Sequence, residues 1–175
     1  RKTAQHLDDL FRKFRVERKS YEIPGRGQVS RELVVHPGAV LILPLLDDGN
    51  VVLIWNYRYA AGAELLELPA GTLEPGEAPA TCAARELEEE AGYKAGHLEP
   101  LCTFYTTPGF TNEFMHAFVA TRLEKTVQRL EDNEQIRVQI MRLSEALEAT
   151  VDGRIIDAKT IAALQVYHYR VVRSL

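Results

Sequence analysis

One segment of the chain, residues 71–92, limits what this sequence can fold into more than any other. It joins a loop punctuated by glycine and proline to a run in which hydrophobic residues recur every three or four positions, as on one face of a helix. The residues of that apolar stripe are Ala80, Ala83, Ala84, Leu87 and Ala91. We therefore expect a helix over Pro79–Ala91, with Gly92 at the position where a left-handed cap is favoured.

Three glutamates of this helix are expected on one face. Residues three and four apart are neighbours on a helix, so Glu89 and Glu90 each lie beside Glu86, with Cβ atoms roughly 5–6 Å apart. Like charges at that spacing destabilise a helix, which indicates a compensating cation. Oxygen ligands favour Mg²⁺ or Mn²⁺ over zinc, for which His and Cys would be expected. Glu88 points away from this face, and we expect it to be a solvated surface charge.

The loop before the helix bears on a simpler interpretation of the same glutamates. A bare run of glutamates is more often a solvated helix face than a metal site. Here, however, Leu68-Pro69-Ala70-Gly71 leads directly into the segment. A loop of this kind lets backbone groups approach a diphosphate or a metal closely, which favours the metal site.

The spacing of these residues resembles the signature of the Nudix hydrolase superfamily. That signature reads Gly, five residues, Glu, seven residues, Arg-Glu-hydrophobic-any-Glu-Glu-any-Gly-hydrophobic. Each of its polar and glycine positions is present from Gly71 to Gly92, and Tyr93 stands where the family usually has an aliphatic residue. The resemblance implies an α/β/α sandwich with an N-terminal β-hairpin arm. Residues 1–36 would form this arm, which dimerises, and residues 37–175 the hydrolase domain.

The resemblance also implies roles for the charged residues of the segment. Glu86 and Glu90 would bind the metal, together with the carbonyl oxygen of Ala70. Glu89 would lie close by as a catalytic group. Arg85 would form an ion pair with Glu77 that fixes the loop to the helix, and its fork would leave the neighbouring glutamates available for the metal.

Further residues resemble the ADP-ribose pyrophosphatase subgroup of that superfamily. Pro108 lies sixteen residues beyond Gly92 in a Thr-Pro-Gly context. An ordinary proline turn between strands is the alternative interpretation of Pro108. The other matching segments are Tyr57-Arg58, Glu67-Leu68-Pro69-Ala70-Gly71 and Asp157-Ala158-Lys159-Thr160.

The subgroup places a catalytic or metal-binding glutamate on a loop after the signature. Residues 131–134 occupy the matching place, just before a strand expected at Ile136–Met141. We expect Glu134 to be the general base, with Asp132 as the second candidate. A charged loop without such a role is the alternative.

Substrate contacts follow from the same resemblance. Arg58 would pair with a phosphate, and Glu113 would accept hydrogen bonds from ribose hydroxyls. The alternative for each is a surface charge at the end of a strand. Tyr21 would stack on the base across a dimer, with Arg31 as a second contact, although Tyr21 could equally pack within its own hairpin.

The remaining pattern predicts a mixed α/β fold. Strands and helices alternate without a strict βαβ rhythm, which favours a mixed sheet flanked by helices over a doubly wound parallel sheet. A hairpin is expected to join residues 39–46 and 51–55, because the turn Asp47–Asn50 tolerates positive φ. Other expected strands are 65–68, 98–107 and 113–120, and other expected helices are 144–150 and 158–172.

The first residues of the chain have two possible organisations. Residues 1–20 are strongly charged and form either a short amphipathic helix or a partner-facing arm. Tyr21–Ile23 and Glu32–His36 are expected to be strands joined by a turn, Pro24-Gly25-Arg26-Gly27. The apolar residues at helical spacing are Leu7, Leu10, Phe11 and Phe14.

Composition and charge exclude several classes of protein. Hydrophobic residues make up 46% of the 175 residues and charged residues 26%, which suits one folded domain. The net charge of −4 argues against nucleic acid as a partner, since neutralising many phosphates needs clustered Lys and Arg. The longest apolar run is far shorter than the roughly 20 residues of a membrane helix. Cys82 and Cys102 are too few for a disulfide framework, so we expect a cytoplasmic protein.

These observations lead to one expected activity and two alternatives. We expect hydrolysis of the diphosphate bond of ADP-ribose to AMP and ribose 5-phosphate by metal-activated water, in a homodimer that requires Mg²⁺ or Mn²⁺. The first alternative is GDP-mannose or a broader range of nucleoside diphosphate sugars. The second is a nucleotide-sensing module that does not cut its ligand, which the joint presence of Glu86, Glu89 and Glu90 disfavours.

Overall fold

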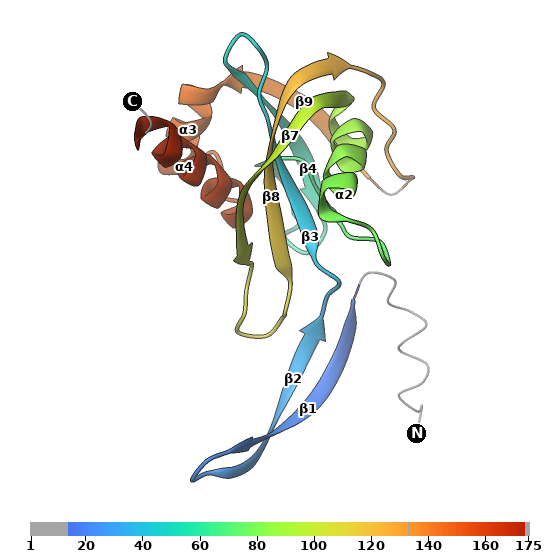
Figure 1. Cartoon of the computed structure of the whole chain (residues 1–175), viewed down its shortest axis with the longest axis vertical. Helices are drawn as coiled ribbons and strands as arrows, with labels where there is room; N and C mark the ends of the chain where they lie inside the picture. The colour runs from blue at the N-terminus through green and yellow to red at the C-terminus, as the bar shows by residue number, and fades with distance from the viewer. Residues whose placement is uncertain (1–13, 133, 174–175) are drawn as a thin grey trace.

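A long β-hairpin stands apart from the rest of the chain as an arm (Figure 1). The computed structural model describes residues 14–132 and 134–173, and its first two strands form a separate antiparallel sheet. These strands are β1 (Arg15–Ile23) and β2 (Gly27–Val35). Gly25, in the turn between them, has a φ of 75°, a conformation that glycine adopts without strain. The expected N-terminal hairpin is confirmed, with longer strands than the sequence indicated.

The amphipathic helix expected over residues 1–20 is wrong for residues 15–20, which belong to β1. Residues 1–13, where most of the expected helix falls, lie outside the described residues. In β1 each residue has a partner in β2, from Arg15 opposite Val35 to Ile23 opposite Gly27. Continuous pairing with β2 outweighs a helical periodicity that depended mainly on residues 7–11.

Two further sheets form the body of the protein. Their strand orders are β6-β3-β8-β7 and β5-β4-β9. Strands β3 and β8 are parallel and the other pairs are antiparallel, which confirms the expected mixed sheet. The first sheet contains β3 (Ala39–Pro44), β6 (Ala70–Thr72), β7 (Tyr93–Tyr105) and β8 (Phe114–Lys125). The second contains β4 (Asn50–Arg58), β5 (Ala63–Glu67) and β9 (Ile136–Arg142).

The hairpin expected between residues 39–46 and 51–55 is only partly correct. Both strands and the turn are present, but β3 and β4 belong to different sheets. A single bridge, Leu45 opposite Val51, joins the two segments next to the turn. All of β3 and the middle of β4 are buried between other strands: β3 pairs with β6 and β8, whereas β4 pairs with β5 and β9.

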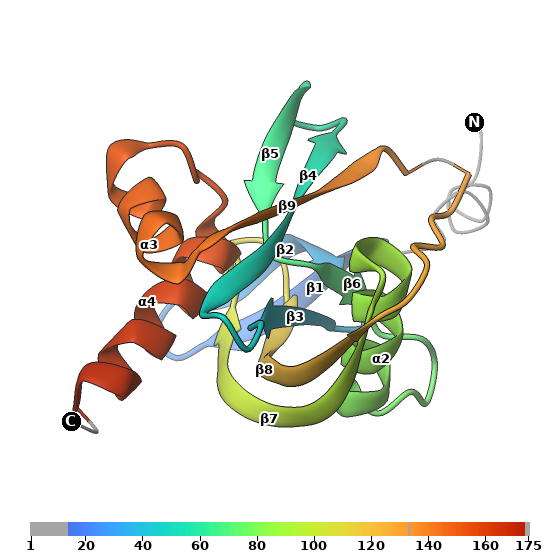
Figure 2. The same cartoon turned by 90° about the horizontal axis from the view of Figure 1, so that it is seen from above.

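Helices cover the sheets from two sides (Figure 2). On one side lies α2 (Pro79–Glu86), which continues as η1 (Leu87–Ala91). On the other side lie α3 (Leu143–Asp152) and α4 (Ala158–Arg173). The expected α/β/α arrangement is confirmed, as are the other expected strands and helices, with shifted ends.

Alternate residues of the central strands divide between two hydrophobic clusters. Leu41 and Leu53 pack with residues of α3 and α4, including Leu164. Val40 and Val52 pack with residues of the carboxylate helix, the name we give to α2 and η1 together (Pro79–Ala91). The sheets therefore bury both faces and hold the helices in fixed positions on either side.

Within residues 14–132 and 134–173, no helix is long and apolar enough to cross a membrane. Strand β2 ends at Val35 and β3 begins at Ala39, close to the expected division of the chain after residue 36. That division into an arm and a hydrolase domain stays a prediction.

Candidate active site

The carboxylate helix ends in an unusual turn. From Leu87 to Ala91 the backbone forms a π-helical turn, in which hydrogen bonds span five residues instead of four. The helix expected over Pro79–Ala91 is confirmed, with a π-helical last turn that the sequence did not indicate. The expected cap is confirmed as well, since Gly92 has a φ of 69° and a left-handed conformation. Turns of this type widen a helix and occur often at functional sites.

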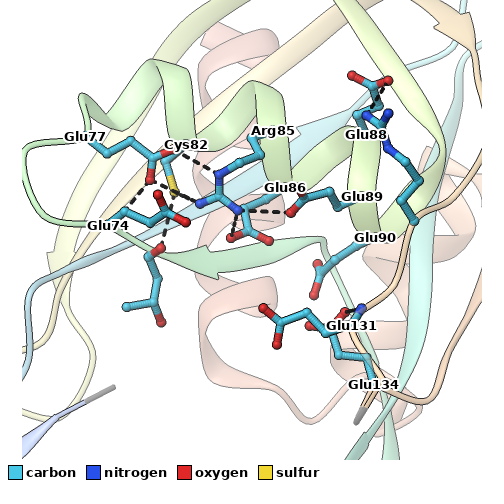
Figure 3. Close-up of polar contacts among 12 residues, drawn as sticks. Glu74, Glu77, Cys82, Arg85, Glu86, Glu88, Glu89, Glu90, Glu131 and Glu134 are labelled. Carbon is cyan, nitrogen blue, oxygen red and sulfur yellow. Dashed lines mark hydrogen bonds and ion pairs between the residues drawn. The ribbon is translucent and has the colours of Figure 1, made fainter. Parts of the chain in front are cut away.

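Arg85 joins the loop to the helix, as expected. Its Nε and Nη2 atoms donate to the two carboxylate oxygens of Glu77 at 3.0 and 3.1 Å. The hydrogen bonds from Arg85 lower the pKa of Glu77 to about 2. Arg85 also donates to one oxygen of Glu86 at 2.8 Å and to one oxygen of Glu89 at 3.0 Å, so it contacts the neighbours expected to stay free, and their availability for a metal stays a prediction (Figure 3). The Arg85 guanidinium therefore holds three carboxylates close together where the loop meets the helix.

Glu90 is the most deeply placed of the three glutamates. Its side chain is buried, and it accepts a hydrogen bond from the Ala70 amide at 2.8 Å. Burial raises the pKa of Glu90 to about 8 and that of Glu86 to about 7. Ionised carboxylates in these positions lack the solvation that they have in water, which a bound cation would replace.

Gly71 lets the loop backbone touch the helix. A Cβ atom at this position would lie 1.9 Å from the Glu86 carboxyl carbon, so any other residue would displace the Glu86 carboxylate. The backbone of residues 70–71 therefore lies directly against the carboxylates of Glu86 and Glu90. Glycine at position 71 therefore leaves room for the Glu86 carboxylate, whereas the close approach of the loop backbone to a diphosphate or a metal stays a prediction.

The chemistry of these groups fits a hard divalent cation. Glu86, Glu90 and the backbone of Ala70 offer oxygen atoms in a confined space, the donor type that Mg²⁺ and Mn²⁺ prefer. In the part of the chain that the structure describes, no three His, Cys, Asp or Glu side chains form a ready metal cluster. The expected ligand set has only two carboxylates and completes them with a backbone carbonyl, so this result does not test it. The metal site stays a prediction.

The loop before β9 brings a further carboxylate to the helix. The charge of Glu134 contributes to the raised pKa of both Glu86 and Glu90, after the larger effect of burial. Figure 3 shows Glu131 and Glu134 beside Glu90, on the side away from Arg85. Glu134 accepts a hydrogen bond from the Glu131 amide at 3.0 Å, whereas Asp132 is exposed in the same loop.

A cavity of about 590 Å³ opens beside the loop that precedes the carboxylate helix. Ala70 and Gly71 form part of its wall, as do Arg58 and Glu113, the two substrate contacts expected in this chain. Glu113 accepts a hydrogen bond from the Thr106 hydroxyl at 2.6 Å. The structure therefore brings residues from six separate segments to one hollow.

Arg58 is held by a partner that was not expected. Its Nε and Nη2 atoms donate to Glu67 at 2.8 and 2.5 Å, and Glu67 is fully buried. Lys159 donates to the same carboxylate at 2.9 Å and to Asp157 at 2.7 Å. Asp157 in turn accepts a hydrogen bond from the Thr160 amide at the start of α4. The cavity wall thus carries two cations anchored on one buried anion.

Glu67 and Lys159 are not among the site residues expected from the sequence. The signal for Glu67 is a charge at the end of a short apolar run, Leu65-Leu66-Glu67-Leu68, which requires a partner once buried. The only sequence signal for Lys159 is its place in Asp157-Ala158-Lys159-Thr160, a segment that resembles the ADP-ribose pyrophosphatase subgroup.

The arm holds the two remaining predicted contacts. Tyr21 is exposed in β1, opposite Val29. Arg31 in β2 donates to the carbonyl oxygen of the neighbouring Ser30. Neither lines the cavity of its own chain, so their roles stay predictions that depend on a second copy.

Comparison with known proteins matches the family model described as NUDIX domain to residues 35–164. The chain is 39% identical to an ADP-ribose pyrophosphatase of Bacillus subtilis (strain 168), over 82% of this chain and 79% of that protein. It is 37% identical to a methanol dehydrogenase activator of Bacillus methanolicus, over 94% and 89%. It is 36% identical to a GDP-mannose pyrophosphatase of Cronobacter sakazakii (strain ATCC BAA-894), over 73% and 71%.

A solved structure described as an ADP compounds hydrolase has the same fold. It superposes with a TM-score of 0.82 and covers 94% of this chain and 89% of its own, at 24% sequence identity. At that identity the likeness supports the fold alone.

Proposed function

Because the chain belongs to the Nudix family of pyrophosphohydrolases, we propose that it hydrolyses the diphosphate bond of ADP-ribose to AMP and ribose 5-phosphate. The observation that carries the proposal is the position of Ala70 and Gly71, which touch the carboxylates of the helix and also line the cavity. Glu86 and Glu90 lie against Ala70 and Gly71, and those two residues line the hollow that also contains Arg58. A diphosphate in this hollow would meet both the metal ligands and a cation.

Glu86, Glu90 and the carbonyl oxygen of Ala70 would hold Mg²⁺, with Mn²⁺ as a possible substitute. When bound, the cation neutralises the diphosphate charge and lowers the pKa of attacking water. The raised pKa values of Glu86 and Glu90 support this assignment, because a cation offsets the cost of two buried negative charges.

Glu134 would act as the general base. As the water oxygen attacks phosphorus, one water proton passes to the Glu134 carboxylate, and the bridging P–O bond breaks. The leaving phosphate departs with the bonding electron pair, and Glu134 then releases its proton to solvent. Asp132 and Glu89 are the other catalytic candidates, Asp132 as the alternative base and Glu89 through its position beside Glu86.

The cavity wall would orient the substrate. Arg58 carries a positive charge for a phosphate, and Glu67 fixes the direction of its guanidinium. Glu113 offers carboxylate oxygens to ribose hydroxyls, in the orientation set by Thr106.

The arm would complete the site in a homodimer. An isolated hairpin of two strands is at best marginally stable in water, and this one exposes Phe14, Val16 and Tyr21. A second copy packed on the arm would cover these side chains and bring Tyr21 and Arg31 to the base in the partner's cavity. Light scattering after size exclusion tests the dimer, and the Tyr21→Ala variant should raise KM more than it lowers kcat.

A panel of nucleotide sugars tests the substrate directly. Purified protein is incubated with Mg²⁺ and either ADP-ribose or GDP-mannose, and the released AMP or GMP is separated by chromatography. We expect a higher kcat/KM for ADP-ribose. A higher value for GDP-mannose would instead favour the second candidate, which the GDP-mannose pyrophosphatase relative supports. Binding of ADP-ribose without any cleavage would indicate the nucleotide-sensing alternative.

A further inference from the structure

The segment that follows β8 is bonded to the end of the carboxylate helix. The Thr126 amide donates to the Gly92 carbonyl at 2.8 Å, and the Arg129 amide donates to the Glu89 carbonyl at 2.9 Å. The last carbonyl groups of a helix have no donor within the helix itself. Residues 126–129 therefore supply donors that the helix cannot provide.

Gln128 makes the central contact of this segment. Its side-chain Nε2 donates to the Glu90 carbonyl at 2.6 Å and lies 3.4 Å from the Ile136 carbonyl, a longer hydrogen bond. An amide NH₂ group has two hydrogens, so both bonds can exist together. Ile136 is the first residue of β9, so this one side chain connects the helix to the far end of the loop.

Gly92 permits this close packing. A Cβ atom there would lie 3.1 Å from the Gln128 amide nitrogen and 3.3 Å from the Thr126 carbonyl oxygen. Its φ of 69° also disfavours any other residue. Glycine is therefore favoured at position 92 for two reasons: the positive φ of the helix cap and the close approach of residues 126–128.

The loop closed by Gln128 carries Glu134. This residue lies two positions before Ile136. Its side chain lies beside Glu90 (Figure 3), and its charge interacts electrostatically with Glu86 and Glu90. Within the loop, Glu131 and Glu134 also exchange hydrogen bonds of 3.0 Å through their backbone and side-chain atoms. The position of Glu134 relative to the helix is therefore set at the points where the loop is tied down.

We propose that Gln128 is a positioning residue, whose side-chain amide holds the Glu134 loop at the distance from Glu86 and Glu90 that hydrolysis requires. The role deepens the proposed function and rests on it. Gln128 itself touches neither substrate nor metal in this account. It acts through Glu134, and its effect belongs to kcat and not to substrate binding.

The Gln128→Met variant tests this role, because methionine has nearly the same length but cannot donate a hydrogen bond. We expect kcat to fall roughly 10- to 100-fold, since small displacements of a catalytic group cost factors of this size, with KM changed by less than about 3-fold. The matched control is Gln165→Met, which removes a side-chain hydrogen bond of 2.7 Å between α4 and Thr150, away from the helix end. The control should keep the wild-type kcat.

A double-mutant cycle separates positioning from a general loss of structure. The Glu134→Gln variant alone should lower kcat, and adding Gln128→Met to it should lower kcat no further, because the group being positioned is already inactive. Losses that multiply in the double variant would overturn the proposal. An unchanged kcat in Glu134→Gln would overturn it as well, since the loop would then position nothing.

Hydrogen exchange gives a readout that does not depend on activity. In Gln128→Met the Arg129 amide should exchange at least several-fold faster than in wild type, while amides of β3 keep their rates. An unchanged rate at Arg129 would contradict the anchoring itself. The two failures are distinguishable: no AMP from the wild-type protein removes the proposed function, whereas normal turnover with multiplying losses removes only the role of Gln128.

Discussion

Two arginines of this protein each donate hydrogen bonds from two nitrogen atoms to one glutamate, but the two pairs lie in very different surroundings. Arg85 holds Glu77 beside the carboxylate helix, where the side chains are 28% and 10% exposed. Arg58 holds Glu67 under the cavity, where the carboxylate is fully buried and also bonded to Lys159. The first pair joins neighbouring parts of one segment, and the second joins two strands to a distant helix.

The difference separates a local clamp from a buried anchor. A partly exposed pair keeps some contact with water, so losing it costs little. A buried carboxylate between two cations has given up its water, and its removal takes the carboxylate partner from Arg58 and leaves Lys159 with Asp157 alone. We therefore expect the Glu67 anchor to dominate stability, while the Glu77 clamp mainly shapes the loop.

The largest effect is expected from Glu67→Ala. Removing the shared carboxylate leaves Arg58 and Lys159 facing each other and should lower the free energy of unfolding by about 3–5 kcal/mol. Urea unfolding followed by circular dichroism measures it. If this variant does not fold, Glu67→Gln, which keeps the shape, provides the value. A loss no greater than that of Glu77→Ala would break the distinction between anchor and clamp.

A smaller effect is expected from Lys159→Met, which removes one of the two cations on Glu67. Arg58 still holds the carboxylate, so the loss should be about 2 kcal/mol, the scale of a hydrogen bond to a charged group. The same unfolding experiment measures it, with Lys19→Met on the exposed arm as the control. If Lys159→Met were as costly as Glu67→Ala, Arg58 would contribute nothing to the anchor.

The smallest effect is expected from Glu77→Ala, about 1 kcal/mol near neutral pH, because this pair is partly exposed. It should also depend on pH. The pKa of Glu77 is lowered from 4.5 to about 2, so its stabilisation is fully present above pH 4.5 and disappears as the pH falls toward 2. Unfolding of wild type and variant at pH 6 and pH 3 measures this. A difference between the two proteins that grows on acidification would contradict the assignment.

The clamp could be predicted from the sequence, and the anchor could not. Glu77 and Arg85 are eight residues apart within the family signature, and the resemblance to that signature implies their pairing. Glu67 and Lys159 are 92 residues apart, and only the complete fold brings the start of α4 next to the end of β5. Local patterns specify contacts along a chain, whereas contacts between distant segments depend on the complete fold.

The same limit applies to the backbone. The pattern of apolar residues predicted β3 and β4 correctly, but the turn between them suggested a hairpin, because turn chemistry says nothing about the other partners of each strand. The π-helical turn at Leu87–Ala91 also has no sequence signal of its own. By contrast, Gly71 and Gly92 could be assigned structural roles in advance, since each is required by a close approach or a positive φ.

The most direct test of the account is AMP release from ADP-ribose by the Glu90→Gln variant with and without Mg²⁺. Glutamine keeps the shape of the side chain but removes the negative charge that would bind the metal. Its amide oxygen can still accept the hydrogen bond from the Ala70 amide. Glu148→Gln, on the exposed face of α3, is the control. We expect Mg²⁺-dependent release by the wild type and the control, and at least a roughly 100-fold lower kcat in Glu90→Gln. Equal release by Glu90→Gln, or release that does not need a divalent cation, would contradict the central claim.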